Sequence, residues 1–223
     1  GTRGALDWGL GLAGAQKLVY FVHADYPSSV GLDAATQPSQ TSPRGDSMIP
    51  RIRIAHLPTP IEPLPRLSAA LGGPRLWVKR DDQTGLAMGG NKTRKLEFVL
   101  AEAQAHGAQT LITVGAVQSN HCRQTAALAA RFGLRCTLVL FGDVPQTPSG
   151  NYLLDRLFGA EIVWAKRETY EEVLQDVFQR AWSEGQRPFL IPLGASTPTG
   201  AVAYAYAFKE FIEQGGEADW MVL

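Results

Sequence analysis

Short apolar runs alternate with longer amphipathic stretches from Met48 to the end of the chain. The apolar runs are typical of strands that are buried on both faces, and the stretches between them repeat with a helical period. Strands separated by helices of about ten to sixteen residues form βαβ units, so the pattern predicts parallel sheets and an α/β fold. The expected strands are 76–80, 111–114, 136–141, 161–164, 188–192 and one that begins at 220, and the expected helices are one from about 93, 119–132, 151–158, 169–184 and 199–214.

The first 47 residues do not follow this alternation. Residues 26–47 are dense in Pro, Ser, Thr and Gly, and such a composition buries too little apolar surface to offset the entropy of ordering. We therefore expect residues 1–47 to be a disordered leader or a tag, with Met48 as the natural start. Gly9 to Gly14 match the G-x-G-x-x-G pattern of dinucleotide sites, but no strand-like run precedes them. A chance match is the preferred interpretation, and a nucleotide-binding domain is the alternative.

The chain ends on Asp219-Trp220-Met221-Val222-Leu223, which has the pattern of a buried strand at its beginning. A domain rarely stops on an unfinished core strand, because the neighbouring strands would be left exposed. We therefore expect the sequence to be a C-terminally incomplete piece of a longer protein.

Composition and charge exclude several classes of function. The 21 basic and 21 acidic residues balance, and no basic cluster indicates a nucleic-acid surface, so a small molecule is the expected partner. No apolar run reaches the length of about 18 residues that a membrane helix requires, and the reducing cytoplasm is the expected compartment. Cys122, Cys136 and four scattered histidines have neither disulfide-framework nor metal-ligand spacing, so no metal site is expected.

A first candidate for chemistry is the run Gly89-Gly90-Asn91-Lys92-Thr93-Arg94-Lys95. The two glycines allow the backbone to approach a ligand, and the helix that begins here favours an anion at its start. Lys92 lies close in sequence to Arg94, Lys95 and the helix end, and we expect these positive groups to lower its pKa. A lowered pKa supplies the neutral amine that Schiff-base chemistry needs. The alternative is an ordinary solvated helix start rich in basic residues.

A second candidate is the loop Gly115 to Gln124, which directly follows the expected strand 111–114. Ligands in α/β proteins bind at the carboxyl ends of parallel strands. Ser119 is a good N-cap, and Gln118, Ser119 and Asn120 place hydrogen-bonding groups beside free amides that suit a substrate carboxylate. The alternative is that Ser119 acts only as a cap. For His121 and Cys122 a role outside catalysis is preferred, with His121 as a surface residue whose hydrogen bonds are satisfied, because neither has a partner for a catalytic dyad.

These two motifs, in this order, resemble the D-cysteine desulfhydrase and 1-aminocyclopropane-1-carboxylate deaminase family. The resemblance runs from about Ile52 to Leu223 and includes Pro58-Thr59-Pro60, Val78 to Asp82 and Ile191 to Ser196. It implies a pyridoxal-phosphate enzyme of the tryptophan-synthase-β-like fold (fold type II), with three-layer parallel sheets and a homodimer when complete. It also implies the domain organisation 48–94 (first part of the large domain), 95–198 (small domain) and 199–223 (return to the large domain, truncated).

The resemblance also assigns roles to individual residues. It implies pyridoxal phosphate held as a Schiff base on one lysine, a catalytic serine, and amide side chains for the cofactor and the substrate carboxylate. Carried over by motif, the roles are Schiff-base lysine for Lys92, catalytic serine for Ser119, cofactor positioning for Asn91, phosphate contact for Lys95, cofactor ring hydroxyl for Asn120, and substrate carboxylate for Gln118.

The implied reaction is α,β-elimination on a D-amino acid, most closely that of a D-cysteine desulfhydrase, which yields pyruvate, ammonia and hydrogen sulfide. Lys92, or Ser119 in a deaminase-like variant, would move the proton. His121 is closer to the desulfhydrase branch, since deaminases more often have Gln there. The alternatives are a 1-aminocyclopropane-1-carboxylate deaminase and an inactive fragment. In the family the phosphate loop, the residue that faces the ring nitrogen and a substrate-pocket tyrosine lie beyond the position of Leu223, so we expect weak cofactor retention and little turnover from this chain alone.

Overall fold

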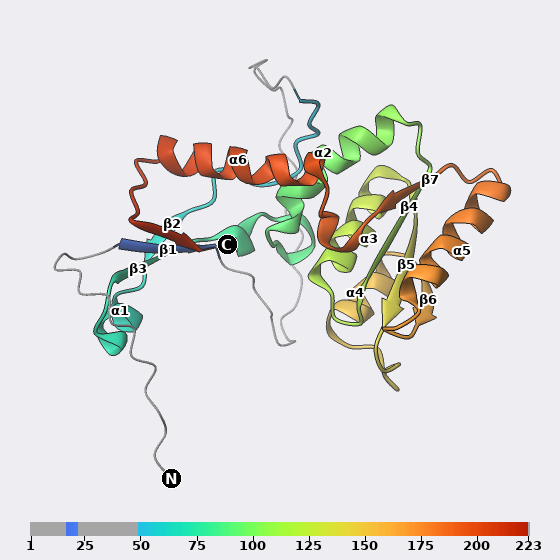
Figure 1. Cartoon of the computed structure of the whole chain (residues 1–223), viewed down its shortest axis with the longest axis horizontal. Coiled ribbons are helices and arrows are strands. Elements are labelled where there is room, and N and C mark those ends of the chain that lie inside the picture. Colours follow the sequence, from blue (N-terminus) through green and yellow to red (C-terminus); the bar gives the residue numbers. More distant parts are fainter. Residues whose placement is uncertain (1–16, 22–48, 223) are drawn as a thin grey trace, which may run out of the picture.

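Two sheets organise the described part of the chain, which in this computed structural model comprises residues 17–21 and 49–222 (Figure 1). The first sheet has the strand order β2-β3-β1-β8 and the second the order β6-β5-β4-β7. In the first sheet β1 runs parallel to both β3 and β8, whereas the short β2 is antiparallel to β3. Its strands are β1 (Lys17–Phe21), β2 (Ile61–Pro63), β3 (Arg75–Lys79) and β8 (Trp220–Val222), and α1 (Pro65–Leu71) connects β2 to β3.

The expectation of a disordered leader is wrong for residues 17–21, because they form β1 between β3 and β8. Both partner strands lie far away in sequence, so no local alternation of strands and helices marks this five-residue run. The remainder of residues 1–47, with the Gly9 to Gly14 pattern, lies outside the described residues, as does Met48.

The second sheet is parallel throughout and has helices on both faces, as the apolar strands predicted. Leu111 and Leu138 pack into the core under α3, while Ile112 and Val139 pack with α5 on the opposite face. Successive strand residues therefore supply two hydrophobic cores. The elements are β4 (Thr110–Ala116), α3 (Asn120–Phe132), β5 (Arg135–Phe141), α4 (Gly150–Leu157), β6 (Glu161–Ala165), α5 (Tyr170–Ser183) and β7 (Pro188–Ile191).

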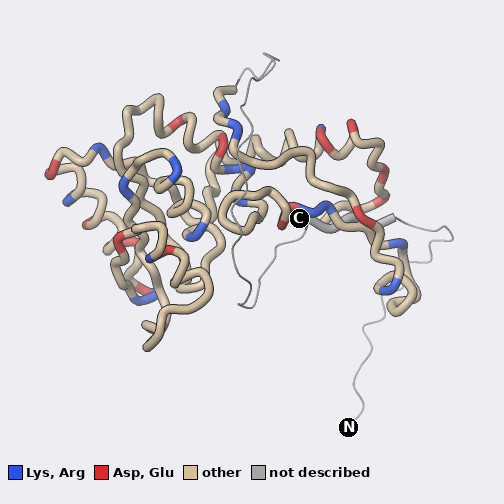
Figure 2. The backbone as a smooth tube through the Cα atoms, turned by 180° about the vertical axis from the view of Figure 1, so that it is seen from behind, with Lys and Arg blue, Asp and Glu red and all other residues tan. Residues whose placement is uncertain are grey.

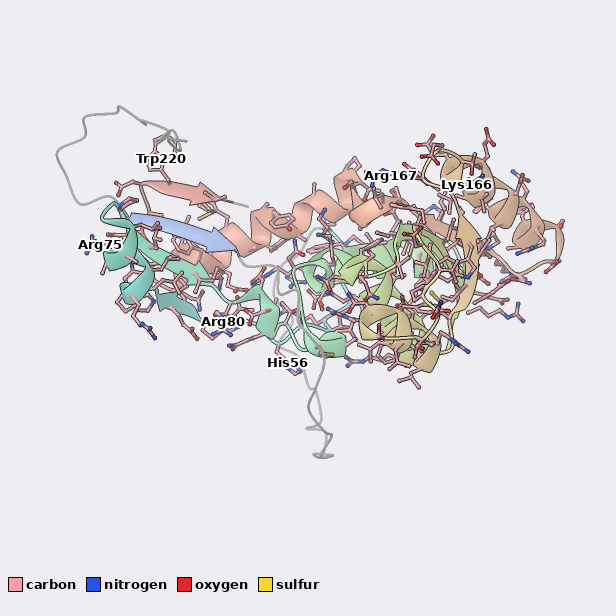
Figure 3. All side chains as sticks on the ribbon, turned by 90° about the horizontal axis from the view of Figure 1, so that it is seen from below. His56, Arg75, Arg80, Lys166, Arg167 and Trp220 are labelled. Carbon is pink, nitrogen blue, oxygen red and sulfur yellow. The ribbon has the colours of Figure 1, made fainter. Side chains whose placement is uncertain are left out.

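The chain passes from the first sheet to the second through α2 (Lys92–Ala105) and returns through α6 (Pro198–Glu213). These two helices pack against each other, and the rings of Phe98 and Tyr206 stack with their centroids 5.3 Å apart. Figure 3 shows the resulting elongated arrangement, with Arg75 and Trp220 at the end of the first sheet and Lys166 and Arg167 toward the second. The domain boundaries expected near residues 95 and 198 remain predictions.

A buried group of charged side chains joins α2, α6 and β3. Arg94 donates to both oxygens of Asp81, from Nε at 2.8 Å and from Nη2 at 2.8 Å, and Nη2 also donates to Glu210 Oε1 at 2.9 Å. Lys79, whose side chain is 0% exposed, donates from Nζ to the same Glu210 oxygen at 2.5 Å and to the Thr59 carbonyl at 2.6 Å. Two cations and two carboxylates thus compensate one another in the interior, as buried charges require. We call Lys79, Asp81, Arg94 and Glu210 the buried charge cluster.

Basic and acidic positions are interspersed along the backbone (Figure 2). Within residues 17–21 and 49–222, no helix combines the length and the apolar character that crossing a bilayer requires. The same residues bring no three His, Cys, Asp or Glu side chains together as metal ligands.

Candidate active site

The turn before α2 has an unusual backbone. Ala87, Met88, Gly89 and Gly90 all have positive φ angles, of 46°, 69°, 73° and 128°. Non-glycine residues in this region cost about 1–3 kcal/mol each and persist only where the surroundings fix them. Glycine is required at position 89, because a Cβ there would lie 1.8 Å from the carbonyl oxygen of Asp82. The turn overlaps the short 3₁₀ helix η2 (Leu86–Met88), follows η1 (Asp81–Gln83), and places Lys92 at the first residue of α2.

The amine of Lys92 is partly buried beside Asn91, to whose Oδ1 it donates at 3.1 Å. Burial, followed by the charge of Lys95, lowers the pKa of Lys92 to about 8. The direction agrees with the sequence-based expectation, but the expected cause was partly wrong. Arg94 does not contribute, because its guanidinium is neutralised by Asp81 and Glu210. The side chain of Lys92 runs past Gly194, where an added Cβ would lie 3.6 Å from Lys92 Cε.

Lys95 lies one turn further along α2 and, like Lys92, lies beside Gly194. Its Nζ donates to the Gly194 carbonyl at 3.1 Å, in the 3₁₀ helix η3 (Leu193–Ala195), and lies 5.6 Å from the centre of the Tyr204 ring. Asn91 Nδ2 donates to the Tyr204 hydroxyl, so Asn91 connects this ring to Lys92. Tyr204 was missed from the sequence, because on α6 it is one of several aromatic residues with helical spacing and no motif marks it.

The second predicted loop lies at the carboxyl end of β4. Ser119 caps α3 as expected, its Oγ accepting from the Cys122 amide at 3.2 Å. Gln118 forms hydrogen bonds with the start of α4. Its Oε1 accepts from the Asn151 amide at 2.8 Å, and its Nε2 donates to the Ser149 carbonyl at 3.2 Å. Gln118 Oε1 and one hydrogen of Nε2 are thus engaged with α4, and a role for Gln118 at a substrate carboxylate remains a prediction.

The amide of Asn120 is held in one orientation. Its Oδ1 accepts from Arg123 Nη1 at 2.9 Å and from Asn151 Nδ2 at 2.9 Å. Because two donors engage this oxygen, the amide plane of Asn120 is fixed. Sequence reasoning missed Arg123 and Asn151, since neither stands out as a chemical group before the fold brings them beside Asn120.

His121 and Cys122 are both buried, so the expectation that His121 lies at the surface is wrong. Thr113 Oγ1 donates to the Ile191 carbonyl at 2.7 Å, so it accepts the hydrogen of His121 Nε2 at 2.8 Å. Burial, with smaller contributions from the charges of Lys92 and Lys95, lowers the pKa of His121 to about 3. Burial also raises the pKa of Cys122 to about 12, which makes this thiol a poor nucleophile at neutral pH.

We call residues 87–90 the lysine turn. This turn contacts α3, the helix that follows the second candidate loop, although the two segments are far apart in the sequence. Arg123 Nη2 and Gln124 Nε2, both on α3, donate to the Gly89 carbonyl at 2.7 Å and 2.9 Å. Residues 52–223, which contain both segments, match the family of pyridoxal-phosphate dependent enzymes. The chain belongs to this family. The match confirms the family and the α/β fold of type II that the two motifs predicted.

Two curated relatives and one solved structure show which members of this pyridoxal-phosphate family the chain is similar to. The chain is 46% identical over 171 residues to a D-cysteine desulfhydrase of Salmonella typhi, covering 74% of this chain and 52% of that protein. A D-cysteine desulfhydrase of Salmonella choleraesuis (strain SC-B67) is 45% identical over 174 residues, covering 75% and 53%. The solved structure of an ACC deaminase homologue superposes with a TM-score of 0.70 at 39% identity, covering 75% of this chain and 51% of that one. The chain thus spans about half the length of the curated relatives it matches.

Because its pKa is lowered, Lys92 should react with aldehydes at a lower pH than an ordinary lysine does. The neutral amine is the reactive form, so labelling of Lys92 should rise through a pH of about 8 and level off above it. An unperturbed lysine, with a pKa of about 10.4, is less than about 1% neutral at pH 8. Reductive labelling with a neutral aldehyde, followed by peptide mass mapping, measures this profile with N-acetyl-lysine amide as reference. Coincident profiles for Lys92 and the reference would contradict the prediction.

Proposed function

We propose that this chain carries the lysine-bearing part of a pyridoxal-phosphate-dependent enzyme that performs α,β-elimination on a D-amino acid, with D-cysteine as substrate. The observation that carries the proposal is the Lys92 amine, with its pKa lowered to about 8, in contact with Asn91 and beside Lys95. The identity to D-cysteine desulfhydrases supports the choice of substrate.

The chemistry of the donors fits the cofactor. Pyridoxal phosphate offers an aldehyde, a ring hydroxyl and a phosphate, and the chain offers the Lys92 amine, the Asn120 amide and the Lys95 ammonium to hold them. Lys95 suits an anion because it is a cation near the start of α2, where the helix amides favour negative charge. When bound, pyridoxal phosphate supplies an electron sink for the negative charge that forms at Cα of an amino acid.

The residues of this chain would bind the substrate and move the proton. The first amides of α3, behind Ser119, suit the substrate carboxylate. With its lowered pKa, Lys92 can take the Cα proton as a general base near neutral pH. Loss of hydrosulfide from Cβ and hydrolysis of the product then convert D-cysteine and water into pyruvate, ammonia and hydrogen sulfide. The complete enzyme is proposed to be a cytoplasmic homodimer, on the family resemblance and the two buried, free cysteines.

The alternative activity is that of a 1-aminocyclopropane-1-carboxylate deaminase, with Ser119 moving the proton. The superposition with the ACC deaminase homologue at 39% identity favours keeping this candidate.

The products distinguish the two activities. D-cysteine should give pyruvate, whereas opening the three-membered ring of 1-aminocyclopropane-1-carboxylate should give the four-carbon 2-oxobutanoate. Both 2-oxo acids are measured after incubation with added pyridoxal phosphate. The assay uses this chain and, in parallel, the proposed complete protein of which it is a part. Release of 2-oxobutanoate alone would favour the deaminase. The absence of both products from the longer protein would overturn the proposed function.

A further inference from the structure

One buried guanidinium connects the two halves of the candidate active site. Arg123 is 3% exposed, and its two terminal nitrogens bond in different directions. Nη2 donates to the Gly89 carbonyl at 2.7 Å, in the turn that leads to Lys92. Nη1 donates to Asn120 Oδ1 at 2.9 Å and to Asn151 Oδ1 at 2.8 Å. The same side chain therefore contacts the lysine turn and the asparagine proposed for the cofactor ring.

The lysine turn needs such support from outside. Its four consecutive positive φ angles include those of Ala87 and Met88, which do not adopt them without constraint. From its own sheet, the Gly90 amide donates to the Asp81 carbonyl at 3.0 Å and to Thr84 Oγ1 at 2.9 Å. From the second sheet, the support consists of Arg123 and the neighbouring Gln124, both directed at the Gly89 carbonyl.

Asn151 completes the arrangement from α4. Its Nδ2 donates to the Gln118 carbonyl at 2.7 Å and to Asn120 Oδ1 at 2.9 Å, while its Oδ1 accepts from Arg123. Arg123 and Asn151 therefore hold the oxygen of Asn120 from two sides. Together these two donors fix the orientation of the Asn120 amide.

We propose that Arg123 is a positioning residue that fixes the Lys92 turn and the Asn120 amide relative to each other, so that both reach one bound cofactor molecule. This inference rests on the proposed function. Lysine cannot replace arginine in this role, because a single ammonium group lacks the planar fork that reaches Gly89, Asn120 and Asn151 together. Arg123 acts through its neighbours and contacts no reacting atom in this scheme.

The test compares where pyridoxal phosphate attaches in the wild-type chain and in Arg123→Lys. Each protein is equilibrated with a low concentration of pyridoxal phosphate and reduced with borohydride, and the adducts on Lys92 and Lys95 are quantified by peptide mass mapping. We expect the ratio of Lys92 to Lys95 adduct to fall about tenfold in Arg123→Lys, the factor expected for one lost charge-assisted hydrogen bond. Arg131→Lys, the same exchange at an exposed position near the end of α3, should keep the wild-type ratio.

A second variant keeps the test decisive if Arg123→Lys does not fold, which circular dichroism will show. Asn151→Ala changes a partly exposed residue at the start of α4 and removes one of the two donors to Asn120. We expect its adduct ratio to fall about threefold, a smaller loss because the contact of Arg123 with Gly89 remains. A wild-type ratio in the folded variants, even with a lower melting temperature, would overturn the positioning role. A wild-type chain without preference for Lys92 would instead overturn the proposed function.

Discussion

Replacing Lys92 with alanine should lower the rate of pyruvate release from D-cysteine by about 10²- to 10⁴-fold, the range for removal of a side chain that moves a proton. The variant loses both the amine that would attach the cofactor and the base that would take the Cα proton. Because the pKa of Lys92 is lowered to about 8, this amine is available at neutral pH to a degree that ordinary lysines are not. Activity is measured as the pyruvate that the proposed complete enzyme forms with added pyridoxal phosphate. Adduct formation is followed in this chain by borohydride reduction.

Two further variants separate the possible causes of that loss. Lys92→Arg keeps a positive charge but no reactive amine, so it should be as inactive as the alanine variant. Lys209→Ala removes an exposed lysine of α6 that forms an ion pair with Glu213, and it should retain full activity. If Lys92→Ala kept its activity and still formed a reducible adduct, the attachment site would lie on another lysine.

Replacing Glu210 with glutamine should lower the free energy of unfolding by about 3–5 kcal/mol, the usual cost of removing one partner from a buried ion pair. Glu210 is the only carboxylate that contacts both cations of the buried charge cluster, among the residues the structure describes. Its loss leaves Lys79 and Arg94 with the single charge of Asp81. Since domains are stable by only about 5–15 kcal/mol, this loss approaches the total. Urea unfolding followed by circular dichroism measures the change.

The pH dependence of stability gives this prediction a second test. Burial alone would raise the pKa of Glu210, but the hydrogen bonds from Arg94 and Lys79 outweigh it and lower the pKa to about 2. The stabilisation is therefore complete above the ordinary pKa of 4.5 and is lost as the pH falls toward 2. The wild-type chain should lose stability over this range, and Glu210→Gln should lack that part of the loss. Glu213→Gln, at an exposed position of the same helix, should change stability by less than about 0.5 kcal/mol, and an equal effect at both positions would contradict the role of the cluster.

The sequence predicted most of the second sheet and the position of both candidate loops. Buried parallel strands and the helices between them have strong local patterns, so β4, α3 and β5 were expected close to their observed bounds. Lys92 and Ser119 were found because glycines and a capping residue mark a helix start next to a strand end.

What the sequence did not predict depends on contacts between distant residues. Glu210 and Lys79 are 131 positions apart, and Arg123 and Gly89 are 34 apart, so no local pattern connects them. The same reason explains the partly wrong account of the Lys92 pKa. Proximity in sequence suggested that Arg94 acts on Lys92, whereas its guanidinium is bonded to Asp81 and Glu210.

The position of β1 has a practical consequence for how the protein is prepared. β1 pairs with β3 on one side and with β8 on the other, so it is an inner strand of the first sheet. A shortened version that starts at Met48 would leave the backbone amides and carbonyls along these sides of β3 and β8 unpaired. Unpaired strand edges recruit strands from other molecules, so trimming the apparently dispensable leader favours aggregation.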